Sequence, residues 1–509
     1  MRTRSRSSLV LATMGLAALV ALAPSAASAT GASTWSTPAF FAENTVEGSE
    51  PDLLHDSGTT YAIWMDVDGG EQRIRTATST DAGLTWSSAV TLASGATVGM
   101  LPKIVSHGAG ITAVWTRVVG GFSIVETAFT LDQGLTWSDP VALSATGVDA
   151  QAPLLVSPEG SLTVVWSSIT SAELGVSDLS IEVLARSSTD GGTSWEPSSM
   201  LTTPGSVTST LRAAGSGDTI SVVWQSFGGG SSFVETSSSS DKGVTWSSPV
   251  TLGGAGAALA LPAVVADDDR IMILWAPRDG TTFSIVARTS TDGGTTWTTP
   301  DVISTGATSG LVSVNLRLTR AGTTLMATWV REREDGRPKV DVSTSDDGGD
   351  TWSAPLVPFG SENDDYEGAP LVVSVGTTLV AFWVSENAVL SSMSNDGGDT
   401  WGESPVAFAI GGSGSRYTVG GSSLNPLLHF ATDGSTITAM WTRGDDPTTI
   451  MVSTFGPTAE ENGGTGAQEP ELAATGPAAT SLWAALAAAL LVGGALFLQP
   501  RLRRATDAR

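Results

Sequence analysis

Tyrosine, whose phenol can act as a nucleophile, occurs three times in this 509-residue sequence. Of the three tyrosines, Tyr61 lies in an apolar run and is predicted to be core, whereas Tyr366 and Tyr417 fall in polar segments predicted to be loops. Glu367 follows Tyr366 directly, so a carboxylate stands beside a phenol there. Together with Asp52, these loop residues are the catalytic candidates. The simpler alternative for each loop tyrosine is packing on the surface.

Three arginines could hold an anionic ligand. The sequence repeats a similar segment several times, as described below, and most copies carry a proline near the start of their first strand. Arg212 and Arg317 stand at that proline position in two of the copies. These first strands are expected to line an axial tunnel. A guanidinium group in such a place can bind a carboxylate through two parallel hydrogen bonds. Arg416 precedes Tyr417 in one of the predicted loops. The alternative for Arg212 and Arg317 is an ion pair with one of the many local acids.

Composition argues against several functions. A formal net charge of −26 repels phosphate backbones, so nucleic acid is not an expected partner. The sequence has no cysteine and therefore no disulfide or thiol chemistry. The histidines at 55, 107 and 429 lack metal-ligand spacing and are predicted to lie in surface turns. Asp267–Asp269 and Asp364–Asp365 could bind Ca²⁺, but acidic loops on an acidic protein need no metal, and we expect no metal or cofactor.

A short box, Ser-x-Asp-x-Gly-x-Thr-Trp with small variations, occurs seven times at intervals of 49 to 58 residues. The Asp can accept hydrogen bonds from backbone amides further along, and the Gly can adopt a positive φ. The Trp buries a large area against a neighbouring element. The box therefore predicts a tight turn between two strands. It assigns structural rather than catalytic roles to Asp81, Asp132, Asp190, Asp241, Asp292, Asp347 and Asp396.

The tryptophans count the repeats independently. Trp483 lies in a C-terminal apolar segment, and the other 16 divide into eight that belong to a box or its remnant and eight that end apolar strands. Two tryptophans per unit indicate eight units. Each unit has about 50 residues and four predicted strands, which is the size of a propeller blade. We expect an all-β fold: an eight-bladed β-propeller over residues 30–458, with seven blades as the alternative. Pairing of the strand after Trp35 with the strand that ends at Phe455 would close it.

Both ends of the sequence carry targeting signals. Three arginines, an apolar stretch and a small-x-small pattern predict a signal peptide over residues 1–29, cleaved after Ala29. Near the other end, the apolar segment 482–498 is just long enough to cross a bilayer as a helix and precedes a basic tail. The Gly- and Glu-rich stretch 459–471 is predicted to be a flexible spacer. Between them stands the pentapeptide Leu472, Ala473, Ala474, Thr475 and Gly476.

The order of pentapeptide, apolar span and basic tail over residues 472–509 resembles the sorting signal that class E sortases of high-GC Gram-positive bacteria recognise. The resemblance implies cleavage between Thr475 and Gly476 and attachment of Thr475 to the wall. A sortase and peptidoglycan are therefore expected partners, and the protein is expected at the cell surface. The alternative is a C-terminal membrane anchor that leaves the propeller outside the cell.

The boxes and their spacing, from about Trp35 to Phe455, resemble the bacterial neuraminidase repeats (BNR repeats, or Asp boxes) of the sialidase superfamily. The resemblance implies a propeller, but such boxes also occur in propellers without catalysis. Sialidases have six blades and use three arginines, a Tyr–Glu pair and an Asp acid. The Arg-Ile-Pro type motif expected on the first innermost strand is absent, and that segment reads Glu50 to Leu53 around Asp52. The catalytic set does not transfer cleanly.

Three functions remain open at this point. The favoured one is a non-catalytic surface module that binds a glycan or a protein at the mouth of the propeller. The second is an exo-glycosidase of sialidase type with a rearranged site, in which a Tyr activated by a carboxylate attacks the anomeric carbon of a sugar acid held by arginines. The third is a mainly structural wall protein. Fold-level analogy alone supports the enzyme.

Overall fold

The computed structural model describes residues 33–42, 45, 51–95, 102–108, 110–171, 179–256, 262–279, 282–305, 316–332, 338–356, 371–385, 388–402, 406–410, 428–443 and 449–457. Within these ranges all regular elements are β-strands, which confirms the all-β prediction. No helix in this part of the chain is long and apolar enough to span a membrane. The predicted signal peptide, spacer, sorting signal and membrane segment lie outside the described residues.

The first complete sheet shows how the repeat folds. Its strands β3 (Asp52–Asp56), β4 (Thr59–Asp68), β5 (Glu71–Ser79) and β6 (Val90–Gly95) pair antiparallel in chain order. The turn between β3 and β4 and the Asp box after β5 lie at the same end, because Thr60 pairs with Ser79. The β4–β5 hairpin turns at the opposite end through Gly69 and Gly70, both with positive φ. We call these the box end and the hairpin end.

Seven further units repeat this plan within the described ranges, and sheets of four strands confirm the predicted order within a unit. Units 2 to 4 are β7 (Lys103–Ser106), β8 (Ile111–Val119), β9 (Phe122–Thr130), β10 (Val141–Ala142); β11 (Asp149–Val156), β12 (Leu162–Ser171), β13 (Leu179–Ser188), β14 (Ser199–Met200); and β15 (Val207–Ser216), β16 (Thr219–Gly228), β17 (Ser231–Ser239), β18 (Val250–Gly256). Units 3 and 4 share one parallel bridge, between Ile181 and Val207.

The later units are built in the same way. Units 5 to 7 are β19 (Ala263–Asp267), β20 (Arg270–Trp275), β22 (Thr282–Ser290), β23 (Asp301–Thr305), with the short β21 (Arg278–Asp279) beside β22; β24 (Arg317–Ala321), β25 (Thr324–Glu332), β26 (Pro338–Ser345); and β27 (Leu371–Val375), β28 (Thr378–Ser385), β29 (Ala388–Ser394), β30 (Val406–Ile410). In unit 6 a single bridge from Val342 to Leu356 stands at the place of the fourth strand.

Unit 8 joins the two ends of the described chain. Strands β31 (Leu428–Thr432), β32 (Ile437–Arg443) and β33 (Thr449–Pro457) come from the C-terminal part, and β1 (Ser33–Trp35) and β2 (Ala39–Ala42) pair with β33. Ser33 pairs with Pro457 and Trp35 with Phe455. One sheet thus combines strands that are more than 400 residues apart in the sequence.

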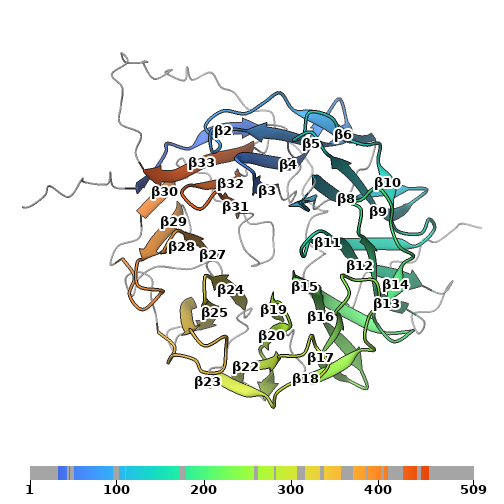
Figure 1. Ribbon diagram of the computed structural model, residues 1–509, viewed down its shortest axis with the longest axis vertical. Helices are drawn as coiled ribbons and strands as arrows, with labels where there is room; N and C mark the ends of the chain where they lie inside the picture. Colours follow the sequence, from blue (N-terminus) through green and yellow to red (C-terminus); the bar gives the residue numbers. More distant parts are fainter. Residues whose placement is uncertain are drawn as a thin grey trace, which may run out of the picture.

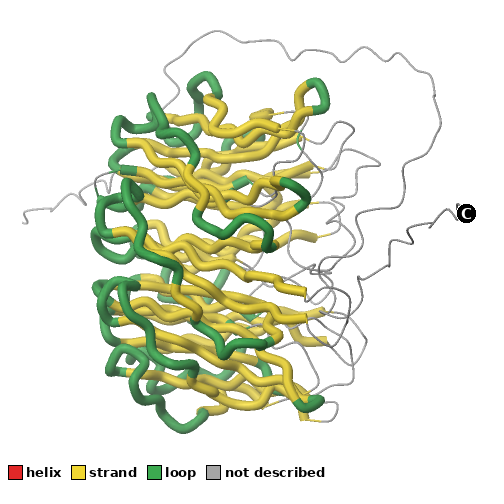
Figure 2. Tube along the Cα trace, turned by 90° about the vertical axis from the view of Figure 1, so that its right-hand side faces the viewer, coloured by secondary structure: helices red, strands yellow, loops and turns green. Residues whose placement is uncertain are grey.

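The units stand side by side around a common centre, each with its first strand innermost (Figure 1). Each innermost strand contacts the next one in chain order, from β3 through β7, β11, β15, β19, β24 and β27 to β31, and β31 contacts β3. Viewed from the side, the strands run across the molecule and most described turns lie along one face (Figure 2).

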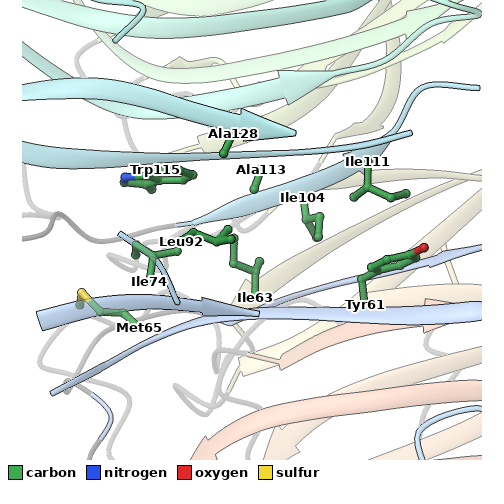
Figure 3. Close-up of a cluster of buried hydrophobic side chains, with 10 residues drawn as sticks. All are labelled: Tyr61, Ile63, Met65, Ile74, Leu92, Ile104, Ile111, Ala113, Trp115 and Ala128. Carbon is green, nitrogen blue, oxygen red and sulfur yellow. The ribbon is translucent and has the colours of Figure 1, made fainter. Parts of the chain in front are cut away.

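Apolar side chains between neighbouring sheets form the core. Between units 1 and 2, Ile63 and Met65 of β4 face Ala113 and Trp115 of β8, and all four are fully buried (Figure 3). Similar clusters fill the other interfaces between units. Period-2 alternation lets each strand pack one set of side chains against the preceding sheet and the other set against the following sheet.

Each Asp box is a closed hydrogen-bonded turn. In the first box, Asp81 Oδ1 accepts the backbone N–H of Thr85 at 2.8 Å and the Ser79 hydroxyl at 2.7 Å, while its Oδ2 accepts the Thr85 hydroxyl at 2.6 Å. The Gly83 N–H donates to Ser79 Oγ, and the Trp86 indole N–H donates to the Gly83 carbonyl. The same carboxylate contacts recur around Asp132, Asp190, Asp241, Asp292, Asp347 and Asp396.

The structure corrects the interpretation of two histidines. His429 was expected in a surface turn, but it lies on the innermost strand β31 and its side chain is only 17% exposed. His107 was expected in a surface turn, but its side chain is buried and packs on Gly191 of the Asp box of unit 3. The Gly191 φ of +74° and the absence of a Cβ allow this approach, since a Cβ there would lie 2.6 Å from the imidazole ring. Burial lowers the pKa of His107.

Candidate ligand-binding ring at the innermost strands

The innermost strands place eight residues at one common register. In every unit we take the residue that pairs with the position directly before the strand tryptophan; in unit 1, Asp52 pairs with Ile63, before Trp64. The equivalent residues in the other units are Lys103, Leu154, Arg212, Ala263, Arg317, Leu371 and His429. Five of the eight have ionisable side chains. We call this set the inner ring.

Three of the five ionisable residues are consecutive around the centre. The Asp52 carboxylate accepts the backbone N–H of Ile104 from β7 at 3.1 Å and lies 3.2 Å from Nδ1 of His429 on β31. Asp52 and His429 keep only 19% and 17% side-chain exposure. One carboxylate therefore links the innermost strands of units 8, 1 and 2.

The charge state of Asp52 results from opposing effects. Burial raises the pKa of its carboxyl, but Lys103 on the neighbouring strand and the hydrogen bonds from His429 and Ile104 together outweigh burial, and the net pKa lies below the ordinary value of 3.8. Asp52 is therefore an anion at neutral pH.

The two arginines of the ring stand across the centre from this group. Arg212 on β15 and Arg317 on β24 flank Ala263 on β19, and these strands lie opposite β3 (Figure 1). Arg212 is exposed and Arg317 is half-buried. The Arg212 guanidinium donates to its own neighbour's carbonyl, Leu211 O, at 2.8 Å.

Both arginines occupy a register one step away from the predicted one. They were expected at the proline position, but Leu211 and Leu316 take that place and pack into the core, and the arginines align with Asp52, the residue after Pro51. Because side chains alternate along a strand, this one-residue step directs each arginine to the other side of its strand from the buried leucine.

Of the remaining candidates the structure describes Tyr61. Tyr61 is 1% exposed and belongs to the core between units 1 and 2, and burial raises its pKa. Tyr366, Glu367, Arg416 and Tyr417 lie outside the described residues.

The acidic run Asp267–Asp269, considered for Ca²⁺ and interpreted as needing no metal, has protein partners in the structure. Asp267 forms an ion pair with Arg320, and Asp269 accepts a hydrogen bond from Thr219 at 3.3 Å. Asp364 and Asp365 lie outside the described residues. Within the described ranges no group of three or more His, Asp or Glu side chains is arranged to hold a metal ion.

Sequence reasoning missed two of the five ionisable members of the ring. Lys103 directly follows Pro102, as Asp52 follows Pro51, and this shared position was the available signal. His429 stands three residues after Pro426 and gave no such signal. Only the pairing of β31 with β32 aligns it with Asp52.

Comparison with known proteins supports the repeat. Residues 218–410 match the model of a family described as a BNR repeat-like domain, which covers less than half of the chain. No curated protein sequence matches the chain.

Solved structures with distant similarity include two glycosidases. The GH93 α-L-arabinofuranosidase of Fusarium graminearum in complex with arabinobiose is 15% identical, with a TM-score of 0.35, over 61% of this chain and 98% of that chain. The Trypanosoma rangeli sialidase in complex with sialic acid is 11% identical, with a TM-score of 0.37, over 82% of this chain and 58% of the sialidase. Such values assign neither an activity nor a residue role to this chain.

Proposed function

We propose that this protein is a closed eight-bladed propeller, displayed on the cell wall, that binds a carboxylate-bearing glycan at the inner ring without hydrolysing it. Closure is supported by the pairing of β1 and β2 with β33 and by the unbroken series of contacts among the innermost strands. The N-terminal signal, the spacer and the pentapeptide with its apolar span and basic tail support export and anchoring at Thr475.

The observation that carries the binding proposal is the inner ring. Two arginines stand at one register, on innermost strands with the small Ala263 between them. Guanidinium groups bind a carboxylate with paired, charge-assisted hydrogen bonds. A ligand with a single carboxylate and many hydroxyl groups fits such a partly polar ring.

The same ring argues against hydrolysis. Glycoside hydrolysis with two carboxyl groups needs one of them protonated at working pH, to donate to the leaving oxygen. Among the described ring residues Asp52 is the one carboxylate, and its lowered pKa keeps it ionised. Its oxygens are also occupied by Ile104 N–H and His429. Asp52 therefore positions neighbouring strands instead of donating a proton.

Binding of the purified protein to carboxylate-bearing and neutral glycans tests the proposal. Replacing Arg212 or Arg317 by Gln removes a charge-assisted hydrogen bond of about 1.5–3 kcal/mol, so the dissociation constant should rise about 10- to 150-fold. Arg320→Gln is the matched control, because Arg320 lies on the same strand β24 near the box end and pairs with Asp267. Equal affinities in all three variants would refute the ring as the site. Release of sugar from a fluorogenic sialoside or arabinofuranoside would refute the absence of catalysis.

A further inference from the structure

Both ends of the described chain leave the molecule at the box end of unit 8. Phe455 pairs with Ile437, which directly follows the turn between the first and second strands of that unit. Ser33 pairs with Pro457, two residues further on. In each unit this turn and the Asp box share one end of the sheet, so Ser33 and Pro457 lie on the face that carries the boxes.

The inner ring lies near the middle of the sheets, measured along the strands. Asp52 pairs with Ile63, which stands four residues from Thr59 at the box end of β4 and five residues from Asp68 at its hairpin end. Arg212 likewise stands in the middle of β15, five residues from Val207 and four from Ser216. The ring is therefore about equally far from both ends of the molecule.

The distance from Pro457 to the anchoring residue is short. Thr475 follows Pro457 by 18 positions, so the segment spans at most about 60 Å even when fully extended. The nine residues of β33 cover about 30 Å from the hairpin end to the box end. To turn the hairpin end toward the wall, about half of the segment would have to run back along the side of the propeller.

We infer that the box end faces the wall and that the hairpin end faces outward, so that a ligand from outside reaches the inner ring through the hairpin end. This inference rests on the proposed wall anchoring and deepens the proposed function by selecting the partner. A ring reached from that end meets glycans that arrive from outside, on another cell or in solution, before it meets the polymers of its own wall.

The absence of cysteine allows a direct test by labelling single-cysteine variants. Ser231 is the first residue of β17, at the hairpin end, and Ser240 directly follows β17, at the box end; both are exposed. Ser231→Cys and Ser240→Cys are thus matched, nearly isosteric changes at the two ends of one strand. Intact cells that express the full-length chain are treated with a small impermeant maleimide or with the same maleimide on a bulky polymer.

We expect the small reagent to label both variants and the bulky reagent to label only Ser231→Cys. After the wall is digested by a muramidase, the bulky reagent should label both sites equally. Equal labelling by the bulky reagent on intact cells, or labelling of Ser240→Cys alone, would overturn the orientation. If the protein is recovered only from the culture medium, the proposed wall anchoring is refuted, and the orientation with it. If the wall-bound protein is labelled asymmetrically but binds no glycan, the proposed ligand alone is refuted and the orientation stands.

Discussion

The contact of Asp52 with two neighbouring units predicts a measurable loss of stability. Replacing Asp52 by Ala leaves the buried Ile104 N–H without its acceptor at 3.1 Å, which costs about 1–3 kcal/mol. It also removes the partner of His429, at 3.2 Å and with both side chains less than one-fifth exposed. We expect a total loss near 3 kcal/mol. With about 2 cal/mol/K per residue over roughly 400 folded residues, this lowers the melting temperature by about 3–4 °C.

Scanning calorimetry at pH 7 measures this difference, and three further variants make it specific. Asp52→Asn keeps an oxygen that can accept the Ile104 N–H, so it should retain part of the stability. Asp68→Ala, the control, removes a carboxylate that is 68% exposed and paired with Arg73, for which less than about 1 kcal/mol is expected. The double variant Asp52→Ala/His429→Ala should lose less stability than the two single variants lose together, because the two residues interact.

The pH dependence follows from the direction of the pKa shift. The pKa of Asp52 is lowered in the folded protein, so its contribution is complete above the pKa of an unfolded Asp, about 3.9, and is lost as the pH falls through the lower folded value. The difference between the native protein and Asp52→Ala should therefore shrink below about pH 4. A melting temperature unchanged by Asp52→Ala at pH 7, or strictly additive losses with His429→Ala, would refute the link between units.

Three other perturbations have defined outcomes. Gly243→Ala should lower the free energy of unfolding in urea by about 2 kcal/mol or more. The φ of Gly243 is +83°, and a Cβ there would lie 2.2 Å from a hydroxyl of the preceding unit. Gly254→Ala is the control, because open space surrounds Gly254. Glu126→Ala should cost about 2 kcal/mol, less than a fully buried pair, because its partner Arg117 is 38% exposed; a loss below 0.5 kcal/mol, roughly that of a surface pair, would contradict this. Hydrogen bonds within its box hold the pKa of Asp292 at about 2. The stabilising contribution of its carboxylate is therefore complete above the pKa range of an unfolded Asp and is lost as the pH falls through about 2. Tryptophan fluorescence should report opening of that box only at such low pH, and opening at pH 5 would contradict this.

The repeat could be predicted from local sequence because its physics is local. The Asp box closes with contacts over two to four residues, such as Ser79 to Asp81 and Asp81 to Thr85, so residue types at fixed spacing suffice. The strand tryptophans mark the strand lengths between boxes. The all-β class and the four-stranded unit followed from these signals.

The candidate site depends on contacts between distant residues and could be predicted only in part. Arg212 and Arg317 were singled out as unusual, but their register was wrong by one residue. Only the pairing of β15 with β16 and of β24 with β25 aligns these arginines with Asp52 instead of Pro51. His107 was placed at the surface because its packing partner, Gly191, lies in another unit.

By itself, the amino-acid sequence determined the class of fold, the unit and its turns, because hydrogen bonds and apolar alternation over a few residues decide them. Only the tertiary structure decided which side chains share the inner ring. Asp52, Lys103 and His429 meet because β3, β7 and β31 lie side by side, although 377 positions separate Asp52 from His429. Pairing across such a distance depends on the sheet of unit 8, in which β1 and β2 pair with β33, and on the register of each innermost strand. Neither is encoded within one repeat.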